Sequence, residues 1–194
     1  MLSFTDIKSH IIDKLEKGLS PRLTYHNVAH TLDVLKQAVD IAKKEGIEDE
    51  NDLLLLKISA LYHDVGFLKI YTGHEEISCE VASAELCDFG FSKGQIEKIC
   101  GMIRATKVPQ QPKNFLEEII CDADLDYLGR NDFFQIGQCL FSEFLEQKIV
   151  YDERSWNSLQ VRFLESHHYF TNTSKERRQK QKQIHLDAIK DKLV

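Results

Sequence analysis

The apolar residues of this sequence recur at helical spacing along almost its whole length. In the segment 27–44, for example, Leu32, Leu35, Val39 and Ala42 fall on one stripe of a helix. No segment keeps the polar–apolar alternation of a half-buried strand. Only nine glycines and three prolines occur among 194 residues, which is little turn chemistry for a many-stranded sheet. We therefore predict an all-α fold, a single helical domain over residues 1–194.

Turn and capping residues predict where the helices begin and end. Ser92 and Asn114 are residue types preferred at helix N-caps, and Thr72 and Glu75 have the spacing of a capping box. The expected helices are 4–18, 27–44, a leucine-rich helix ending at Gly66, one opening at 72–75, one after Ser92, one from Asn114 to Gly129, 132–149, 153–170 and 174–192. We expect a core at about 25–130 with the C-terminal helices of 131–194 packed on it.

Charge and composition exclude several classes of partner. A net charge of −6 argues against a nucleic-acid duplex or an anionic membrane as the main partner. No stretch is apolar enough to span a bilayer, and the start "MLSFTDIKSH" lacks the features of a signal peptide. The five cysteines form no CxxC pair and are typical of buried thiols in a reducing compartment. We expect a cytoplasmic protein.

A His-Asp pair in "LYHDVG" follows the apolar run at 53–61. His63 and Asp64 are expected in the last turn of their helix, where the helix dipole favours a cation. A neutral imidazole and a carboxylate at this place could bind a divalent metal. The alternative is a helix C-cap beside a solvated acid.

The segment "YHNVAH" adds two histidines at a spacing of four residues. His30 is expected inside the helix that Asn27 caps, whereas His26 lies at or before the cap and points elsewhere. His30 is thus the better ligand candidate. A core histidine bonded to a backbone carbonyl is the alternative.

The segment "ICDADLDYLG" contains three aspartates that helical geometry separates. Asp124 falls on the apolar face, whereas Asp122 and Asp126 fall on the side expected to be wetter. A buried carboxylate costs several kcal/mol, roughly, unless a cation compensates it. No lysine or arginine lies within one turn on that face, so a metal ion is the simplest partner for Asp124.

Together these segments predict a site with two imidazoles and two carboxylates: His30, His63, Asp64 and Asp124. Mixed nitrogen and oxygen ligation suits one divalent ion of Mn, Fe, Co, Ni or Zn, and Mg less well. Four protein ligands on an octahedral ion leave two positions for water and a substrate oxygen. That arrangement is typical of hydrolysis.

The order H…HD…D, carried by "YHNVAHT", "LYHDVGF" and "CDADLDYLG", resembles the HD-domain superfamily of metal-dependent phosphohydrolases. With "GHEEIS" and "ATKVPQQPKNFLEE", the sequence is most similar to uncharacterised bacterial HD-domain hydrolases, over Tyr25 to Arg130. The resemblance implies a helical bundle, the four ligands above, and hydrolysis of a phosphate ester, commonly of a nucleotide.

The sequence departs from that family at two positions. Several two-metal members carry extra histidines, but "MIRATKVP" has Val108 where one of them would stand, so we expect a single metal. Some nucleotidases of the superfamily place a glutamate where this chain has Phe67, so its general acid must lie elsewhere. His74 and Glu75 are the nearest candidates, at a helix N-terminus that favours phosphate. Glu75 is equally explained as the acid of the capping box.

Further charged and aromatic residues have competing interpretations. Lys107 and Arg104 could bind a substrate phosphate or could be solvated surface residues. Asp122 could orient a ligand histidine or be exposed. The remaining candidates are expected to be structural: His167 and His168 in packing or capping, "KERRQKQKQ" as a solvated helix face, and Trp156 with nearby phenylalanines in the core.

The predicted function is a metal-dependent phosphohydrolase that cleaves a nucleotide-like phosphomonoester or phosphodiester with a metal-activated water. Two alternatives remain: a sensory module that binds a nucleotide without turnover, and an oxygenase with two irons, which the missing histidine disfavours. The expected partner is a small phosphate ester, and a homodimer is also considered.

Overall fold

The computed structural model describes residues 3–193, and within them every regular element is a helix. This confirms the predicted all-α class. The elements are α1 (Phe4–Gly18), α2 (Val28–Lys44), α3 (Glu50–Tyr62), the short 3₁₀ helix η1 (Val65–Leu68), α4 (His74–Asp88), α5 (Lys93–Ala105), α6 (Phe115–Asp124), a second 3₁₀ helix η2 (Asp126–Gly129), α7 (Phe133–Glu146), α8 (Glu153–Ser166) and α9 (Asn172–Asp191).

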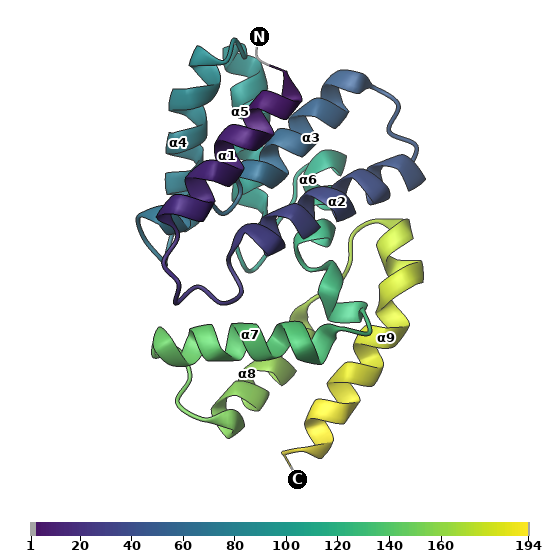
Figure 1. Cartoon of the computed structure of the whole chain (residues 1–194). Coiled ribbons are helices and arrows are strands. Elements are labelled where there is room, and N and C mark those ends of the chain that lie inside the picture. Colours follow the sequence, from purple (N-terminus) through teal and green to yellow (C-terminus); the bar gives the residue numbers. More distant parts are fainter. Residues whose placement is uncertain (1–2, 194) are drawn as a thin grey trace.

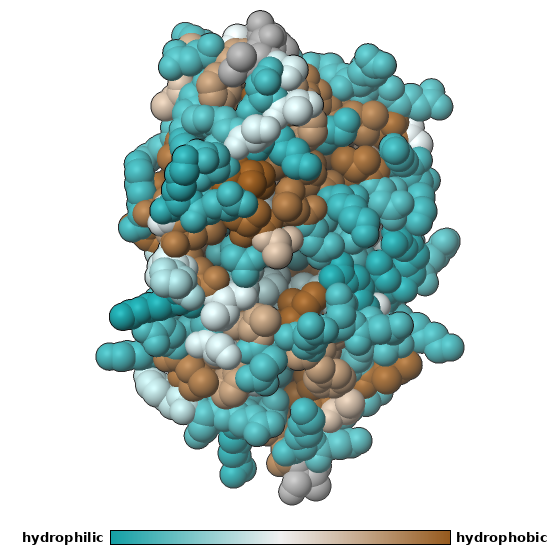
Figure 2. Space-filling model, viewed as in Figure 1, coloured by the Kyte–Doolittle hydropathy of each residue, from teal (hydrophilic) through white to brown (hydrophobic). Residues whose placement is uncertain are grey.

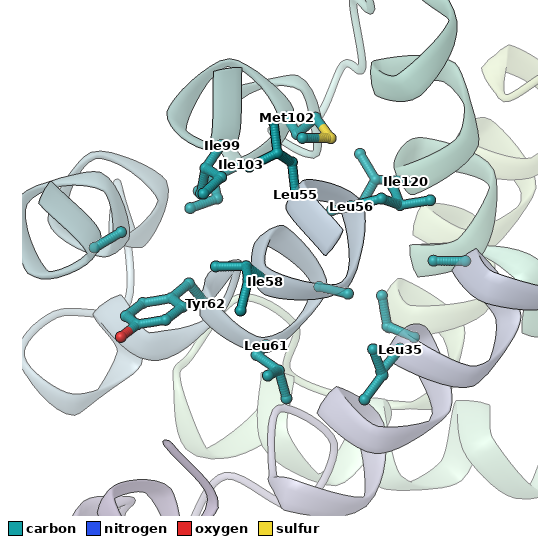
Figure 3. Packing of buried hydrophobic residues seen from close by; sticks show 14 of the residues in the cluster. Leu35, Leu55, Leu56, Ile58, Leu61, Tyr62, Ile99, Met102, Ile103 and Ile120 are labelled. Carbon is teal, nitrogen blue, oxygen red and sulfur yellow. The ribbon is translucent and has the colours of Figure 1, made fainter. Parts of the chain in front are cut away.

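Helices α1 to α6 form a bundle around α3, in the upper half of Figure 1. The leucine run predicted to be buried fills the centre of this bundle: Leu55, Leu56, Ile58 and Leu61 are fully buried. Figure 3 shows these side chains between Leu35 of α2, Ile99, Met102 and Ile103 of α5, and Ile120 of α6. A helix that is apolar on all sides must be surrounded by other elements, which explains the central place of α3.

Helices α7, α8 and α9 lie on the other side of η2, in the lower half of Figure 1, and have a smaller apolar cluster of their own. That cluster consists of Tyr25, Leu125, Tyr127, Leu128, Phe133, Leu164, Leu186 and Ile189. Because Tyr25 precedes α2 and η2 follows α6, the cluster joins the C-terminal helices to the bundle. The exact division near residue 130 stays a prediction.

Three of the predicted helix starts are confirmed by their caps. The side chains of Asn27, Ser92 and Asn114 accept hydrogen bonds from backbone amides of the first turns of α2, α5 and α6. The cap predicted at Thr72 is wrong. Helix α4 begins one residue after Gly73, whose φ of 80° lies in the left-handed region, and no side chain caps it. Glu75 is therefore free of a capping role.

The leucine-rich helix ends earlier than predicted. Helix α3 stops at Tyr62, His63 is its C-cap, and Asp64 lies in the turn before η1. Gly66, the predicted stop, instead lies inside η1.

The surface in Figure 2 is mostly hydrophilic with smaller apolar areas between. Across residues 3–193 no helix has both the length and the apolar character needed to cross a membrane.

Candidate metal centre

Four elements bring the predicted ligands together. His30 lies in the first turn of α2, whose position Asn27 fixes by accepting hydrogen bonds from the amides of Ala29 and His30 at 2.9 and 3.3 Å. His63 and Asp64 form the turn between α3 and η1, and Asp124 is the last residue of α6. The helices meet at their ends, where backbone geometry can aim side chains into a shared space.

Helix α4 holds the His-Asp turn in place. The Ser78 hydroxyl donates to the carbonyl of His63 at 2.7 Å and accepts from the amide of Gly66 at 2.8 Å. A Cβ atom at Gly66 would lie 1.9 Å from the carbonyl oxygen of His74, so only glycine allows η1 and α4 to approach this closely. The same approach brings His74 beside Asp64.

The donor atoms of the four predicted ligands converge. Nε2 of His30 lies 3.1 Å from Oδ1 of Asp124 and 3.4 Å from Oδ2 of Asp64. Nε2 of His63 lies 3.2 Å from Oδ2 of Asp64 and 3.5 Å from Oδ1 of Asp124, and the two Nε2 atoms are 3.3 Å apart. Atoms that bind one ion at about 2.0–2.2 Å lie about 2.8–3.6 Å from each other. All five separations fall in that range.

The hydrogen bonds of His63 show why this cluster suits a cation. Nδ1 of His63 lies 2.9 Å from the carbonyl of Ala60, and because a carbonyl only accepts, Nδ1 carries the proton. In the neutral ring Nε2 then presents a lone pair to Nε2 of His30 and to both carboxylates. Oδ2 of Asp64 is buried and has no hydrogen-bond partner. A divalent ion among these atoms would satisfy all of them.

The pKa shifts of these four residues also indicate that the cluster favours a positive charge. Burial alone would lower the pKa of His30, but the adjacent carboxylates of Asp124 and Asp64 raise it to about 9. Burial opposes ionisation of Asp124, yet the two histidines hold its pKa at about 2. The pKa of His63 is likewise raised and that of Asp64 lowered. The carboxylates thus stay ionised, and a metal would compete with protons for the imidazoles.

His74 and Glu75 lie beside this cluster. Nε2 of His74 is 3.3 Å from Oδ1 of Asp64, and its Nδ1 donates to the carbonyl of Tyr71 at 3.1 Å. Burial lowers the pKa of His74, but the bond with Asp64 outweighs it and the pKa is raised. Glu75 is 7% exposed, and its Oε2 has no hydrogen-bond partner. Both residues line the cavity next to the cluster.

His26 is turned away from the cluster, as predicted, by a residue that the sequence analysis missed. Glu143 of α7 is fully buried. One of its oxygens accepts from the amides of Tyr25 and His26 at 2.9 and 3.1 Å, and the other contacts Nδ1 of His26 and accepts from the Tyr71 hydroxyl at 2.8 Å. The sequence feature that indicates a buried role for Glu143 is a single acid inside the apolar stretch "CLFSEFL".

Phe67 occupies the position at which some nucleotidases carry a glutamate. Its ring stacks on His74 with a centroid distance of 3.8 Å and on His26 with one of 4.2 Å. The two imidazoles are thus held on either side of a phenyl ring. Phe67 positions His74 and supplies no acid of its own.

A cavity of about 530 Å³ opens from the cluster toward α7 and α8. Asp64, Asp124, His74 and Glu75 line its inner end, and the exposed Lys107 also contributes to the lining. Its outer wall is formed mainly by apolar residues of α7 and α8, among them Leu140, Phe144, Trp156, Leu159 and Phe163. The prediction that Trp156 and the nearby phenylalanines are core residues is incomplete, because they line this cavity. Arg104 is absent from its lining and forms an exposed ion pair with Glu76 at 2.9 Å.

The two aspartates predicted on a wet face are both buried, so that prediction is wrong. Asp122 accepts hydrogen bonds from the amides of Phe170 and Thr171 and from the Thr171 hydroxyl, at 2.7–2.9 Å. Asp126 binds the guanidinium of Arg178 through both oxygens, at 2.8 and 2.9 Å. The C-terminal segments cover this face, and Asp122 orients no ligand histidine.

The basic segment of α9 also differs from the predicted solvated face. Lys182 is 2% exposed, and its ammonium caps the C-terminus of α8 by donating to the carbonyls of Leu164, at 3.1 Å, and His167. Arg178 forms the ion pair with Asp126 described above, and Arg177 pairs with Asp40 at 2.7 Å. His167 is itself the C-cap residue of α8, and its backbone amide donates to the carbonyl of Phe163 at 2.9 Å, so the predicted capping role is confirmed.

Comparisons with known proteins agree with this geometry. The HD domain model matches residues 27–127, which is more than half of the chain. The fold is similar to that of a predicted HD superfamily hydrolase from an uncultured Thermotogales bacterium, with 21% identity, a TM-score of 0.63, and coverage of 98% of this chain and 91% of the other. Bacillus subtilis YpgQ, solved in complex with ADP, has 19% identity and a TM-score of 0.63, with coverage of 95% and 94%.

A search of curated proteins gives no significant match in sequence. The family model covers the whole span from Asn27 to Tyr127, which includes all four converging residues. The chain belongs to the HD domain family.

Proposed function

We propose that this protein is a metal-dependent phosphohydrolase with one divalent ion held by His30, His63, Asp64 and Asp124. The observation that carries the proposal is that the two Nε2 atoms lie 3.3 Å apart and that each lies 3.1–3.5 Å from one oxygen of Asp64 and one of Asp124. When bound, such an ion lowers the pKa of a water molecule and neutralises charge on a phosphate oxygen.

The chain's own residues provide the remaining functions. The contact of Nε2 with Asp64 raises the pKa of His74 and so favours its protonated form, which can protonate the leaving oxygen of a substrate in the cavity. The unpartnered Oε2 of Glu75 can accept a hydrogen bond from the attacking water. Lys107, which also lines the cavity, can bind a phosphate oxygen.

A nucleotide-like phosphomonoester or phosphodiester is the proposed substrate. The support is the resemblance in the sequence and the ADP bound to YpgQ, a protein with the same fold. A nucleotide-binding module without turnover is a second candidate, since ADP in that structure is equally consistent with binding alone. An oxygenase with two irons remains disfavoured, because Val108 occupies the position of the extra histidine.

The test is a screen of phosphomonoesters and phosphodiesters with metal-reconstituted protein, together with a metal count per chain. We expect one metal per chain and turnover of at least one ester. Glu75→Gln and His74→Gln should lower kcat with metal retained, by about 10²–10⁴-fold for a residue acting as acid or base. Glu76→Gln is the matched control, because Glu76 is the exposed neighbour paired with Arg104. Tight nucleotide binding without product would favour the sensory module and contradict the hydrolase.

A further inference from the structure

The cavity described above connects the metal-ligand cluster to an apolar chamber. Asp64 and Asp124 lie at its inner end, and Trp156, Leu159 and Phe163 of α8 face it from the outer end. A group bound at the cluster would therefore extend directly into this chamber.

The residues that line the cavity carry little positive charge, so they favour a ligand with a small negative charge. Of the described residues that line it, Lys107 is the one lysine or arginine, whereas Asp64, Glu75 and Asp124 are acidic. A polyphosphate carries several negative charges and needs several cationic partners. One phosphate group, compensated by the bound ion and Lys107, is what this cavity can accept.

The outer wall offers few hydrogen bonds. The cavity-lining residues contributed by α7 and α8 are apolar except for Gln160, whose amide N–H group lies 3.4 Å from the side-chain oxygen of Asn157. A polar group pressed against such a wall would leave its donors and acceptors unpaired, which discriminates strongly against it. A hydrocarbon surface carries no such cost.

We propose that the preferred substrate is a monophosphate ester whose alcohol carries a large hydrocarbon group, bound against Leu140, Phe144, Trp156 and Phe163. This inference rests on the proposed function, and it narrows the phosphate esters that the site accepts. The charge of the cavity disfavours nucleoside di- and triphosphates, and a nucleoside monophosphate is the competing outcome in the test.

Trp156 allows a test that is independent of turnover. It is the single tryptophan of the sequence, so tryptophan emission, excited selectively over the six tyrosines, reports on the apolar wall. Metal-loaded protein is titrated with butyl-, hexyl- and octylphosphonate, which hydrolysis cannot cleave, and with AMP. We expect the affinity to rise by about two- to fourfold for each added methylene, as for hydrocarbon leaving water. The Trp156 emission should shift to the blue as water is displaced.

A matched pair of variants on α7 tests the location. Leu140→Phe places extra volume in the chamber, whereas Leu145→Phe makes the same change at an exposed site on the same helix that does not line it. Leu140→Phe should reduce the affinity for octylphosphonate by at least about tenfold, which corresponds to about 1.4 kcal/mol. The affinity for butylphosphonate should change little. Unchanged butylphosphonate binding shows that the variant is folded.

The outcomes separate the two proposals. Affinity that is independent of chain length, or tighter binding of AMP than of octylphosphonate, would overturn the apolar substrate. Equal effects of Leu140→Phe and Leu145→Phe would overturn the assigned chamber. Chain-length-dependent binding with no hydrolysis of octyl phosphate or any other ester would overturn the hydrolase and support the apolar recognition.

Discussion

Glu143 of α7 accepts a hydrogen bond from the backbone amide of His26, 117 residues earlier in the chain, at 3.1 Å. The contact fixes the segment that leads into α2 and therefore the first ligand of the cluster, His30. It also makes α7 part of the support of the site. Four groups converge on this one buried carboxylate.

Replacing Glu143 by alanine should destabilise the fold strongly. The change leaves two buried amides and the Tyr71 hydroxyl without an acceptor, which costs about 3–5 kcal/mol in free energy of unfolding. Urea denaturation measures it. Glu146→Ala is the control on the same helix, since Glu146 is exposed and pairs with Arg22 at the surface. A loss below about 1 kcal/mol for Glu143→Ala would contradict the buried network.

Metal should stabilise the protein, and removal of a single ligand should abolish that effect. A metal at one hundred times its Kd stabilises by about 2.7 kcal/mol, so chelation should lower Tm. Asp64→Asn and Asp124→Asn should bind less metal and show no shift of Tm on adding it. Asp88→Asn, at an exposed residue of α4, should behave like the wild type. Elemental analysis and differential scanning calorimetry provide the two measurements. Retention of one metal per chain by both site variants would refute the assigned ligands.

Gly66→Ala should disturb the site although Gly66 is not one of the proposed metal ligands. The added Cβ would lie 1.9 Å from the carbonyl oxygen of His74, so η1 and α4 must separate. We expect a loss of more than about 2 kcal/mol in unfolding free energy. Gly94→Ala in α5 is the matched change, because a Cβ there meets nothing within 4 Å, and it should be neutral or stabilising. Equal stability of the two variants would show that η1 and α4 do not approach so closely.

His167 should make the fold sensitive to mild acid. Burial, together with the neighbouring charge of Lys182, lowers the pKa of His167 to about 3, against an ordinary value of 6.5. The unfolded chain thus binds the proton more readily, so stability is lost as the pH falls from 6.5 toward 3. The loss reaches about 2 kcal/mol at pH 5. His167→Gln should remove this part of the pH dependence, as measured by urea unfolding between pH 7 and pH 5.

His168 provides the control for that measurement, since it is exposed and adjacent in sequence. His168→Gln should keep the pH dependence of the wild type. A wild-type slope in His167→Gln would mean that other groups cause the acid sensitivity.

The sequence contained most of the information about the helices and the cluster. Caps at Asn27, Ser92 and Asn114 were predictable because the signal lies within four residues of the helix that it starts. Asp124 was predictable because a carboxylate on an apolar face needs a cation. The cap at Thr72 failed because the left-handed Gly73 begins α4 without any side-chain bond, and capping-box spacing carries no information about that turn.

What could not be predicted depends on contacts between distant segments. Asp122 and Asp126 were placed on a wet face because the helical period cannot tell solvent from a later helix that covers the same side. Their partners, Thr171 and Arg178, lie 49 and 52 residues further on. The role of Trp156 was misjudged for a related reason, since an aromatic stripe looks the same in a sequence whether it faces a packed core or a cavity.

The bidentate contact between Arg178 and Asp126 has a consequence for how the chain reaches its working state in the cell. Arg178 belongs to the last helix, whereas Asp126 follows Asp124 by two residues. During translation the first six helices leave the ribosome while Asp122, Asp126 and the Tyr25 segment still lack their partners. A nascent chain can therefore assemble its leucine-rich centre early, but the geometry around Asp124 is completed only after synthesis of α9.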